Sequence, residues 1–304
     1  MDNKTFFLAN NEKGYALPMV MAVSMIIVLI TMAIVSSVRQ KLATAIELQN
    51  RNVAYLKAYS ATSEVLYYFS SSPLNSLDLE VRLSDGGPTR WNLYGEPIRL
   101  SQGVSFTLRD LSGMISPVLQ PNFFRKLVEY VLHDSEKTNA LMDSFLDWQD
   151  ADDLKRLNGA ERWDYSAAGY SYAPRNFYIQ VSEELLLVKG FDPETFEKIR
   201  QDIAYWNVGF INYLTMSEQT LSAFLQNDSL VKRILELRRK GELTWQIFSQ
   251  LTGVQPTEDL VTFASGYIKF VLTAQEQTSV STIEASVAKI ETQSAPLTIL
   301  EWKS

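Results

Sequence analysis

An uncharged stretch near the N-terminus constrains the fold of this chain more than any other feature. No charged side chain occurs between Lys13 and Arg39, and residues 15–38 contain 19 apolar side chains out of 24. A helix of this length, rising about 1.5 Å per residue, crosses the roughly 30 Å hydrocarbon core of a bilayer. A signal peptide has an apolar region of only about 7–15 residues, and Val35-Ser36-Ser37 makes a weak cleavage site. We therefore predict a retained transmembrane helix at residues 15–38, in preference to a signal peptide or a buried core helix.

The helix is expected to continue well past the membrane. Apolar residues recur near one face at spacings of three to four residues or their multiples, at Val38, Leu42, Ala45, Val53, Leu56 and Leu66. The run Ser70-Ser71-Ser72-Pro73 then predicts the end of the helix. We expect one helix over residues 15–72, half in lipid and half amphipathic. Lysine and arginine flank the membrane segment on both sides, so charge alone leaves its orientation open.

The overall composition excludes several classes of protein. Hydrophobic residues make up 46% and aromatic residues 12% of the 304 positions, which is enough for packed cores and excludes a wholly disordered chain. A formal net charge of −7 argues against a nucleic-acid binder held by non-specific charge. Because the chain has no cysteine, it has no disulfide framework, no lipid-modified cysteine anchor and no thiolate site.

Beyond the long helix the pattern changes from strand to helix and back. Residues 97–110 predict a hairpin, because Val104, Phe106 and Leu108 alternate with polar residues. Helical stripes follow, and strand patterns return after Pro256. The later predicted strands lie near residues 268–272, 280–290 and 297–302. We therefore predict an α+β fold. Its expected parts are β residues 73–115, an all-α insert at 116–256, and further β residues at 257–304.

Two stretches of the insert are similar to each other. One runs from Glu183 through Gly190 and Pro193 into a helix expected to reach Ile203, and the other runs from Leu243 to Pro256. Both look like helix-hairpin-helix or SAM-like units, which predicts two such units at about 116–206 and 207–256. Residues 182–204 carry six acidic and three basic side chains, so we expect packing modules and not DNA binding.

An acidic cluster carries more than half of the net charge. Residues 143–164 hold seven acidic and three basic side chains. Asp147 and Asp150 lie three positions apart on a predicted helix and share a face. Asp152 and Asp153 follow at the helix end, and the turn at 158–159 brings Glu161 back. Calcium takes six to eight oxygen ligands, so a calcium site and a solvated acidic face both remain open. The spacing is not that of an EF-hand, which needs Asp or Asn at position 154 and Gly at 155.

The sequence offers little for catalysis. Its one histidine, His133, stands at the end of an amphipathic helix, where a surface or capping role is expected. It contains no G-x-S-x-G elbow, phosphate-binding loop or H-E-x-x-H pair. Asp150 and Asp152 have the residue types of a glycosidase acid–base pair, but clustered acids fit cation binding better. We predict that the chain is not an enzyme, with a membrane-anchored hydrolase as the alternative from another class.

The start of the apolar helix resembles a known processing site. Glu12-Lys13-Gly14-Tyr15 resembles the prepilin-peptidase site of type IV pilins and type II secretion pseudopilins. The resemblance implies cleavage between Gly14 and Tyr15 after a leader of residues 1–14, and methylation of the new N-terminus. Most of these proteins carry glutamate as the fifth mature residue, where this chain has Met19. The missing glutamate is a feature of the type II secretion minor pseudopilin K family, and it suits the top of a filament.

The rest of the chain resembles that same family in the same order. The matching blocks are RDLSG at 109–113, FLDWQDADD at 145–153, NGAE at 158–161, YAPRN at 172–176, SEELLLVKG at 182–190 and FASGY at 263–267. The resemblance implies a pilin-like fold, with the long helix on an antiparallel sheet and a helical insert between strands.

The resemblance also implies function, partners and location. A K-type minor pseudopilin is expected at the tip of the pseudopilus, nucleating and capping it for protein export. Expected partners are minor pseudopilins I and J, with H as a further candidate, the prepilin peptidase and the inner-membrane assembly platform. The expected location is the bacterial inner membrane, with a single span and a periplasmic ectodomain. The family's calcium binding favours Asp150, Asp152 and Glu161 as ligands, with Asp147 and Asp153 behind them. A type IV pilus minor pilin is the near alternative, since it shares the leader.

Overall fold

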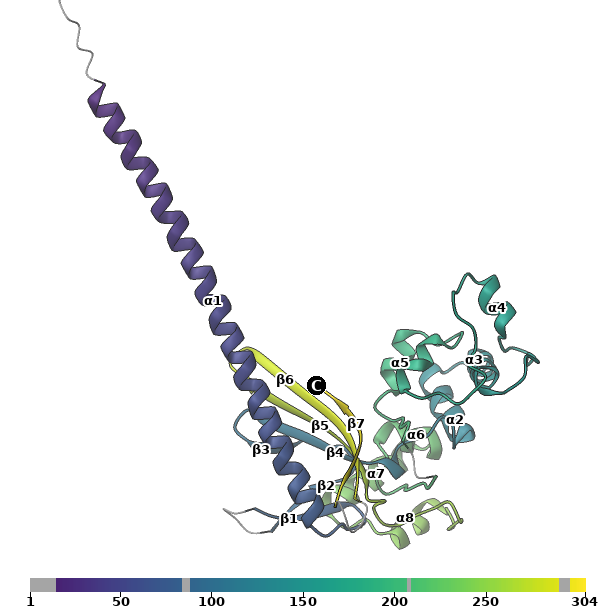
Figure 1. Ribbon diagram of the computed structural model, residues 1–304. Coiled ribbons are helices and arrows are strands. Elements are labelled where there is room, and N and C mark those ends of the chain that lie inside the picture. The colour runs from purple at the N-terminus through teal and green to yellow at the C-terminus, as the bar shows by residue number, and fades with distance from the viewer. Residues whose placement is uncertain (1–14, 84–87, 207–208, 290–295) are drawn as a thin grey trace, which may run out of the picture.

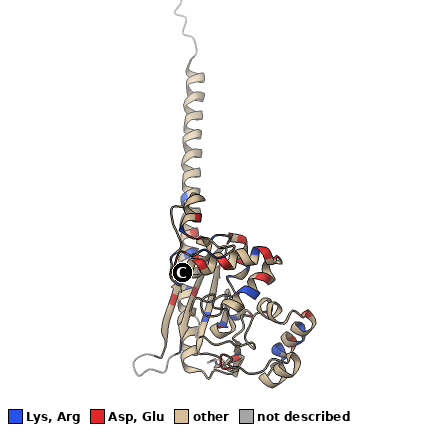
Figure 2. Ribbon diagram, turned by 90° about the vertical axis from the view of Figure 1, so that its right-hand side faces the viewer, with Lys and Arg blue, Asp and Glu red and all other residues tan. Residues whose placement is uncertain are grey.

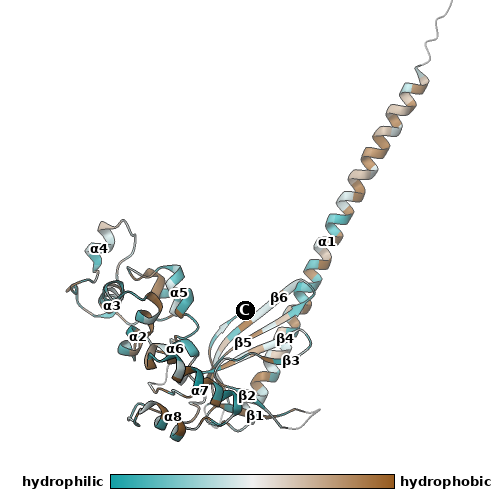
Figure 3. Cartoon of the chain, turned by 180° about the vertical axis from the view of Figure 1, so that it is seen from behind, coloured by the Kyte–Doolittle hydropathy of each residue, from teal (hydrophilic) through white to brown (hydrophobic). Residues whose placement is uncertain are grey.

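The computed structural model describes residues 15–83, 88–206, 209–289 and 296–304 (Figure 1). The predicted leader and Gly14 lie outside the described residues. The chain consists of a projecting helix, a β part and a helical insert. Figures 1 and 3 show the large sheet between the helix and the insert.

Helix α1 (Ala16–Ser71) is continuous for 56 residues, as the pattern predicts. Pro18 is tolerated in its first turn because backbone N–H groups there have no partner within the helix. The helix ends at Ser72, whose N–H donates to Tyr68 O, immediately before Pro73. Its N-terminal half stands clear of the remaining chain and bears no charge until Arg39 (Figure 2). Among the described helices, α1 alone has the length and apolar composition needed to cross a membrane.

The C-terminal half of α1 packs on the sheet through a narrow face of mostly small side chains. The buried residues on this face are Ala54, Ala58, Ala61, Thr62, Val65 and Phe69. Spacings of three and four residues keep them on one side of the helix. They share a core with strand residues such as Phe106, Phe270 and Ile283. The predicted helix-on-sheet packing is confirmed.

The main sheet is antiparallel, with the order β3 (Ile98–Ser101), β4 (Val104–Asp110), β5 (Tyr267–Glu276), β6 (Ser279–Ala288) and β7 (Thr298–Lys303). In β4, Val104, Phe106 and Leu108 are buried, which confirms the alternation. Strands β4 and β5 are neighbours although the insert separates them in sequence, and Asp110 pairs with Ile268. The insert therefore leaves the sheet and returns to it at a single point.

A second, two-stranded sheet was not foreseen from the sequence. Strands β1 (Asp78–Arg82) and β2 (Pro88–Asn92) pair antiparallel. Leu79, Val81 and Trp91 are buried in the core shared with α1 and β4. Trp91 packs edge-on against Phe106, with ring centroids 4.7 Å apart. The small sheet thus extends the surface against which the end of α1 is held.

The insert has its own hydrophobic core, which includes Phe124, Phe145, Leu185, Ile234 and Phe248. Its α-helices are α2 (Pro121–Leu132), α3 (Ser135–Gln149), α4 (Arg162–Ala167), α5 (Pro193–Ile199), α6 (Glu218–Leu225), α7 (Asp228–Lys240) and α8 (Trp245–Thr252). Short 3-10 helices η1 (Leu111–Gly113) and η2 (Ser182–Leu187) complete it. Five α-helices begin at a side chain that accepts a backbone N–H of the first turn, at Asp134, Asp192, Ser217, Asn227 and Thr244.

One helix of the insert is shorter than expected. The sequence pattern predicted a helix reaching Ile203, but α5 ends at Ile199. Ile115 N–H donates to Asp202 O at 2.8 Å, and Ala204 N–H donates to Ile115 O at 2.9 Å. These bonds form a parallel bridge between Ile115 and Ile203, which requires extended backbone where the helix would continue. The contact ties the first residues of the insert to its middle.

Candidate functional site

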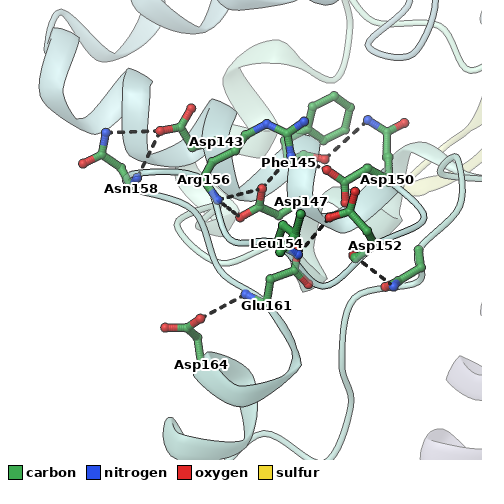
Figure 4. Close-up of polar contacts among 12 residues, drawn as sticks. Asp143, Phe145, Asp147, Asp150, Asp152, Leu154, Arg156, Asn158, Glu161 and Asp164 are labelled. Carbon is green, nitrogen blue, oxygen red and sulfur yellow. Dashed lines mark hydrogen bonds and ion pairs between the residues drawn. The ribbon is translucent and has the colours of Figure 1, made fainter.

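The predicted cation ligands lie at the end of α3 and in the loop that leads to α4 (Figure 4). Asp147 is in the last turn of α3 and is fully buried, and Asp150 is the residue that ends this helix. The loop returns to Asp147 at Arg156, whose backbone N–H donates to both Asp147 oxygens at 3.3 and 3.2 Å. The helix end therefore organises the loop that follows it.

Arg156 lies between two of the predicted ligands. Its Nη1 is 2.6 Å from Asp147 Oδ1 and also contacts Asp150 Oδ2. The hydrogen bond to Asp150 raises the pKa of Arg156, and Asp147 adds to this effect. Sequence reasoning did not identify this residue, although it is one of only three basic side chains beside the seven acids of residues 143–164. In this conformation Arg156 balances part of the charge of the loop.

Glu161 is the carboxylate of the cluster that has no compensating partner. It is buried, and neither of its oxygens has a hydrogen-bond partner among the described residues. One oxygen of Asp150, Oδ1, is also buried without a partner there. Burial, reinforced by the charge of Asp147, raises the pKa of Glu161 to about 7. An unpaired buried carboxylate is costly, so this arrangement calls for a bound proton or a bound cation.

Gly159 and Asn158 hold the returning loop against α3. A side chain at Gly159 would overlap Asp147 Oδ2, so the position needs glycine for space. Asn158 donates from both its backbone N and its Nδ2 to Asp143 Oδ2, each at 3.1 Å. The predicted turn at these two residues is therefore confirmed, and it brings Glu161 back to Asp147.

The other two predicted ligands lie on the exposed part of the loop. Asp152 Oδ1 accepts the backbone N–H of Leu154 at 2.8 Å. Asn176 Nδ2 donates to Asp152 O and to Asp153 Oδ1, each at 3.4 Å. Within residues 15–83, 88–206, 209–289 and 296–304, no three acidic or histidine side chains converge on a common ion position. Asp147 and Asp150 instead share Arg156, and their charges act on Glu161. The remaining two predicted ligands lie at the exposed rim of the loop.

A buried carboxylate joins three of the sequence blocks within the insert. Glu184 accepts Trp148 Nε1–H at 2.9 Å, and Arg175 Nε and Nη2 donate to its two oxygens at 2.5 and 2.9 Å. Burial alone would raise the pKa of Glu184, but the bonds from Arg175, Trp148 and the Gln180 backbone outweigh it and lower that pKa. The blocks around residues 148, 175 and 184 therefore form one structural unit beside the acidic loop.

A second buried carboxylate joins the two blocks that flank the insert. Asp110 accepts Ser112 Oγ–H at 2.6 Å and Ser265 Oγ–H at 2.5 Å. Asn212 Nδ2 and Thr215 Oγ1 also donate to it, each at 3.3 Å. Asp110 therefore binds the ends of β4 and β5 to each other and to the insert.

The expected processing site is described only in part. Tyr15 precedes the first turn of α1, and Met19 N–H donates to Tyr15 O at 3.2 Å. Met19 has 71% of its surface exposed, on the projecting half of the helix. Cleavage at Gly14 and methylation of Tyr15 stay predictions.

Comparison with known proteins agrees with this architecture. Residues 106–207 match the family model of the type II secretion system (T2SS) protein K. This segment contains most of β4, Asp110 itself, the Glu184 centre and the whole acidic loop. A search of curated proteins gave no significant match.

A solved structure has the same fold over most of the chain. It is the crystal structure of the GspK-GspI-GspJ complex from the type 2 secretion system of enterotoxigenic Escherichia coli. One chain of that complex matches with a TM-score of 0.54 and 16% identity, over 86% of this chain and 98% of that chain. The expected pilin-like α+β fold is therefore confirmed. The resemblance of residues 106–207 to type II secretion protein K is confirmed as well, and this segment lies within a chain that has a pilin-like long-helix fold.

Proposed function

We propose that this protein is a minor pseudopilin that nucleates and caps the pseudopilus of a type II secretion system. The observation that carries the proposal is the combination of a protein K domain with a long projecting helix whose apolar half is uncharged. A structural role agrees with the expectation that the chain is not an enzyme, since the matched family is a component of the secretion apparatus. The match to a type II secretion protein favours a role in secretion over the two alternatives, a type IV pilus minor pilin and a membrane-anchored hydrolase.

Met19 and the placement of the insert support the proposed position at the tip. An intramembrane carboxylate pairs with the N-terminal amine of the next subunit in filaments of this kind, and methionine cannot form that pair. The insert projects from the side of the sheet away from α1 (Figure 1), so it would widen any filament that contained it internally. Both features favour an end position over an internal one.

The partner surface is the exposed face of the amphipathic half of α1. Exposed apolar side chains in this half of the helix include Leu42, Ile46, Tyr55, Leu56 and Tyr59, each with 46–63% of its surface exposed. The rings of Tyr55 and Tyr59 stack with centroids 6.4 Å apart. Exposed apolar and aromatic side chains on a helix suit helix-to-helix packing. We assign this surface to minor pseudopilins I and J, because the similar solved chain lies in a complex of that composition.

Processing and location complete the proposal. The prepilin peptidase would cut between Gly14 and Tyr15, and the new N-terminus would be methylated. Helix α1 then anchors the protein in the inner membrane as a single span, with the β part and insert in the periplasm. Pseudopilin H and the assembly platform are further expected partners. Mass spectrometry of the membrane-extracted protein tests the processing step, because a chain that still begins at Met1 beside active peptidase contradicts it.

We also propose that the acidic loop binds calcium. The support is chemical: Glu161 has two unpartnered buried oxygens and Asp150 has one, and hard carboxylate oxygens are the ligands that calcium prefers. Asp150, Asp152 and Glu161 would hold the ion, with Asp147 and Asp153 as further ligands. Arg156 then has to leave Asp150, which its partly exposed side chain allows. The ion would fix the loop between α3 and α4.

A secretion assay tests the function as a whole. Deleting the gene should abolish release of type II substrates into the medium, and the wild-type gene on a plasmid should restore it. Secretion that continues unchanged in the deletion strain would contradict the proposal. Twitching motility, which depends on type IV pili, serves as the second readout, since its loss with intact secretion would indicate a pilus minor pilin.

A further inference from the structure

A buried arginine in the insert has no counter-charge. Arg238 lies in the last turn of α7 with only 4% of its surface exposed. Its Nη1 donates to Met216 O at 2.7 Å, and its guanidinium lies over the Tyr94 ring, 4.9 Å from the centroid. Its Nε and Nη2 are buried and have no hydrogen-bond partner in the part of the chain that the structure describes.

The nearby carboxylates are already paired with other cations. Glu96 binds Arg239 at 2.9 Å, and Asp202 binds Arg109 at 2.8 Å. No carboxylate of the described residues lies within ion-pair distance of Arg238. Within each of these two ion pairs the charges neutralise each other, so the positive charge of Arg238 has no carboxylate to balance it.

The group stays charged despite its burial. Burial lowers the pKa of Arg238 to about 10, which still leaves it protonated at neutral pH. The C-terminal end of α7 and the Tyr94 ring stabilise the charge. Neither of them accepts a hydrogen bond from Nε or Nη2, and a buried charged donor without an acceptor is strongly destabilising.

The free donors have the geometry of an anion site. Nε–H and Nη2–H of one guanidinium point in parallel along the same edge, which is the fork that binds anions in a bidentate manner. Arg109 lies close enough to act on the charge of Arg238, and its Nε is likewise buried without a partner in the described residues, although its own charge is paired with Asp202. Since these atoms are sealed from solvent, the ligand has to be small.

We propose that the Nε–Nη2 edge of Arg238 binds a small inorganic anion of the size of chloride, at the junction between the β part and the insert. The bound anion compensates the arginine on α7 that contacts both the Tyr94 ring and the Met216 carbonyl just before α6. This role is independent of calcium and of the position of the protein in a pseudopilus.

The test uses the full-length chain in detergent micelles, with sodium chloride as the probe and sodium gluconate as the large-anion control at equal ionic strength. Chloride is expected to raise Tm by about 2–4 °C with saturation, because it binds only the folded state. Arg238→Lys keeps the charge but removes the fork, so this variant should lose the chloride dependence. Arg239→Lys at the exposed neighbouring position should retain it.

Crystals of the wild-type protein grown in 100 mM sodium bromide provide a second test, which needs no variant. An anomalous peak beside Arg238 Nε and Nη2 is expected. Equal Tm values in chloride and gluconate would overturn the proposal. An electron-density peak beside Arg238 Nε and Nη2 that has no anomalous signal would also overturn it, because such a peak is an ordinary water molecule.

Discussion

Ser265 Oγ donates a 2.5 Å hydrogen bond to Asp110 Oδ1, although the two residues lie 155 positions apart in the chain. Asp110 ends β4, where the insert begins, and Ser265 stands just before β5, where it ends. Together with Asn212 and Thr215 of the insert, they close a loop of about half the protein on one buried carboxylate. The junction explains why two short sequence blocks at opposite ends of the insert have matched chemistry.

Asp110→Asn is expected to loosen this junction. The amide has one acceptor oxygen where the carboxylate has two. Its NH₂ group would face side chains that are themselves donors, so some of these buried groups would lose their hydrogen-bond partner. The cost is about 1–3 kcal/mol of unfolding free energy, seen as a lower Tm in calorimetry. Asp259→Asn, at an exposed position, is the matched control and should leave Tm unchanged. Equal Tm values for the two variants would show that Asp110 does not hold the junction.

Glu184→Gln tests the acid limit of stability. The pKa of Glu184 is lowered in the folded protein, so its ionised form contributes stability at pH values above about 4.5. That contribution disappears as the pH falls through the lowered pKa, when the native carboxylate becomes protonated. The variant should therefore have a lower Tm than wild type at pH 7, with a difference that shrinks below pH 4. If the difference in Tm between wild type and variant stays the same from pH 7 to below pH 4, the lowered pKa of Glu184 does not contribute to stability.

Glu161→Gln separates calcium binding from simple burial. Without calcium the variant should be the more stable protein at pH 8, because it removes an unpaired buried charge. With 1 mM calcium the order should reverse, since only the wild type gains stability from the bound ion. The measurement is Tm with calcium and with chelator. If the wild-type Tm is the same with calcium and with chelator, the proposed calcium site is wrong.

Gly159→Ala tests the packing of the loop on α3. The added methyl group overlaps Asp147 Oδ2, so the loop has to move away from the helix end. We expect a loss of about 1–3 kcal/mol, the usual range for overpacking. Asp147→Ala removes the obstructing oxygen, and the double variant should lose less than the sum of the two single losses. Strict additivity would show that the two residues do not meet.

Much of the fold could be predicted because its signals are local. The uncharged run and the serine-proline ending defined α1, and the alternation of Val104, Phe106 and Leu108 defined β4. Strand β1 also alternates, but it offers only two apolar residues, Leu79 and Val81, where β4 has three, and the pattern does not stand out. The end of α5 was missed because a contact with Ile115, far away in sequence, decides it.

The sequence showed which acidic residues belong to the candidate cation site, but it did not show which side chains pair with one another there. Acidic side chains of residues 143–164 could be grouped from the sequence, but Arg156 reaches Asp147 only because of the path of the loop. Arg238 was hidden for a related reason. It belongs to a basic run at the end of an amphipathic helix, and such a run is usually solvated. Its burial follows from how α7 packs near Tyr94, which no local pattern encodes.

The most direct test of the central claim is the composition of the complex that this protein forms with its neighbours. The full-length chain would be co-expressed with the I and J minor pseudopilins of the same bacterium and purified in detergent. Its mass would then be measured by light scattering after size exclusion. We expect one complex that contains a single copy of each of the three proteins. A monomeric chain that elutes apart from I and J would contradict it.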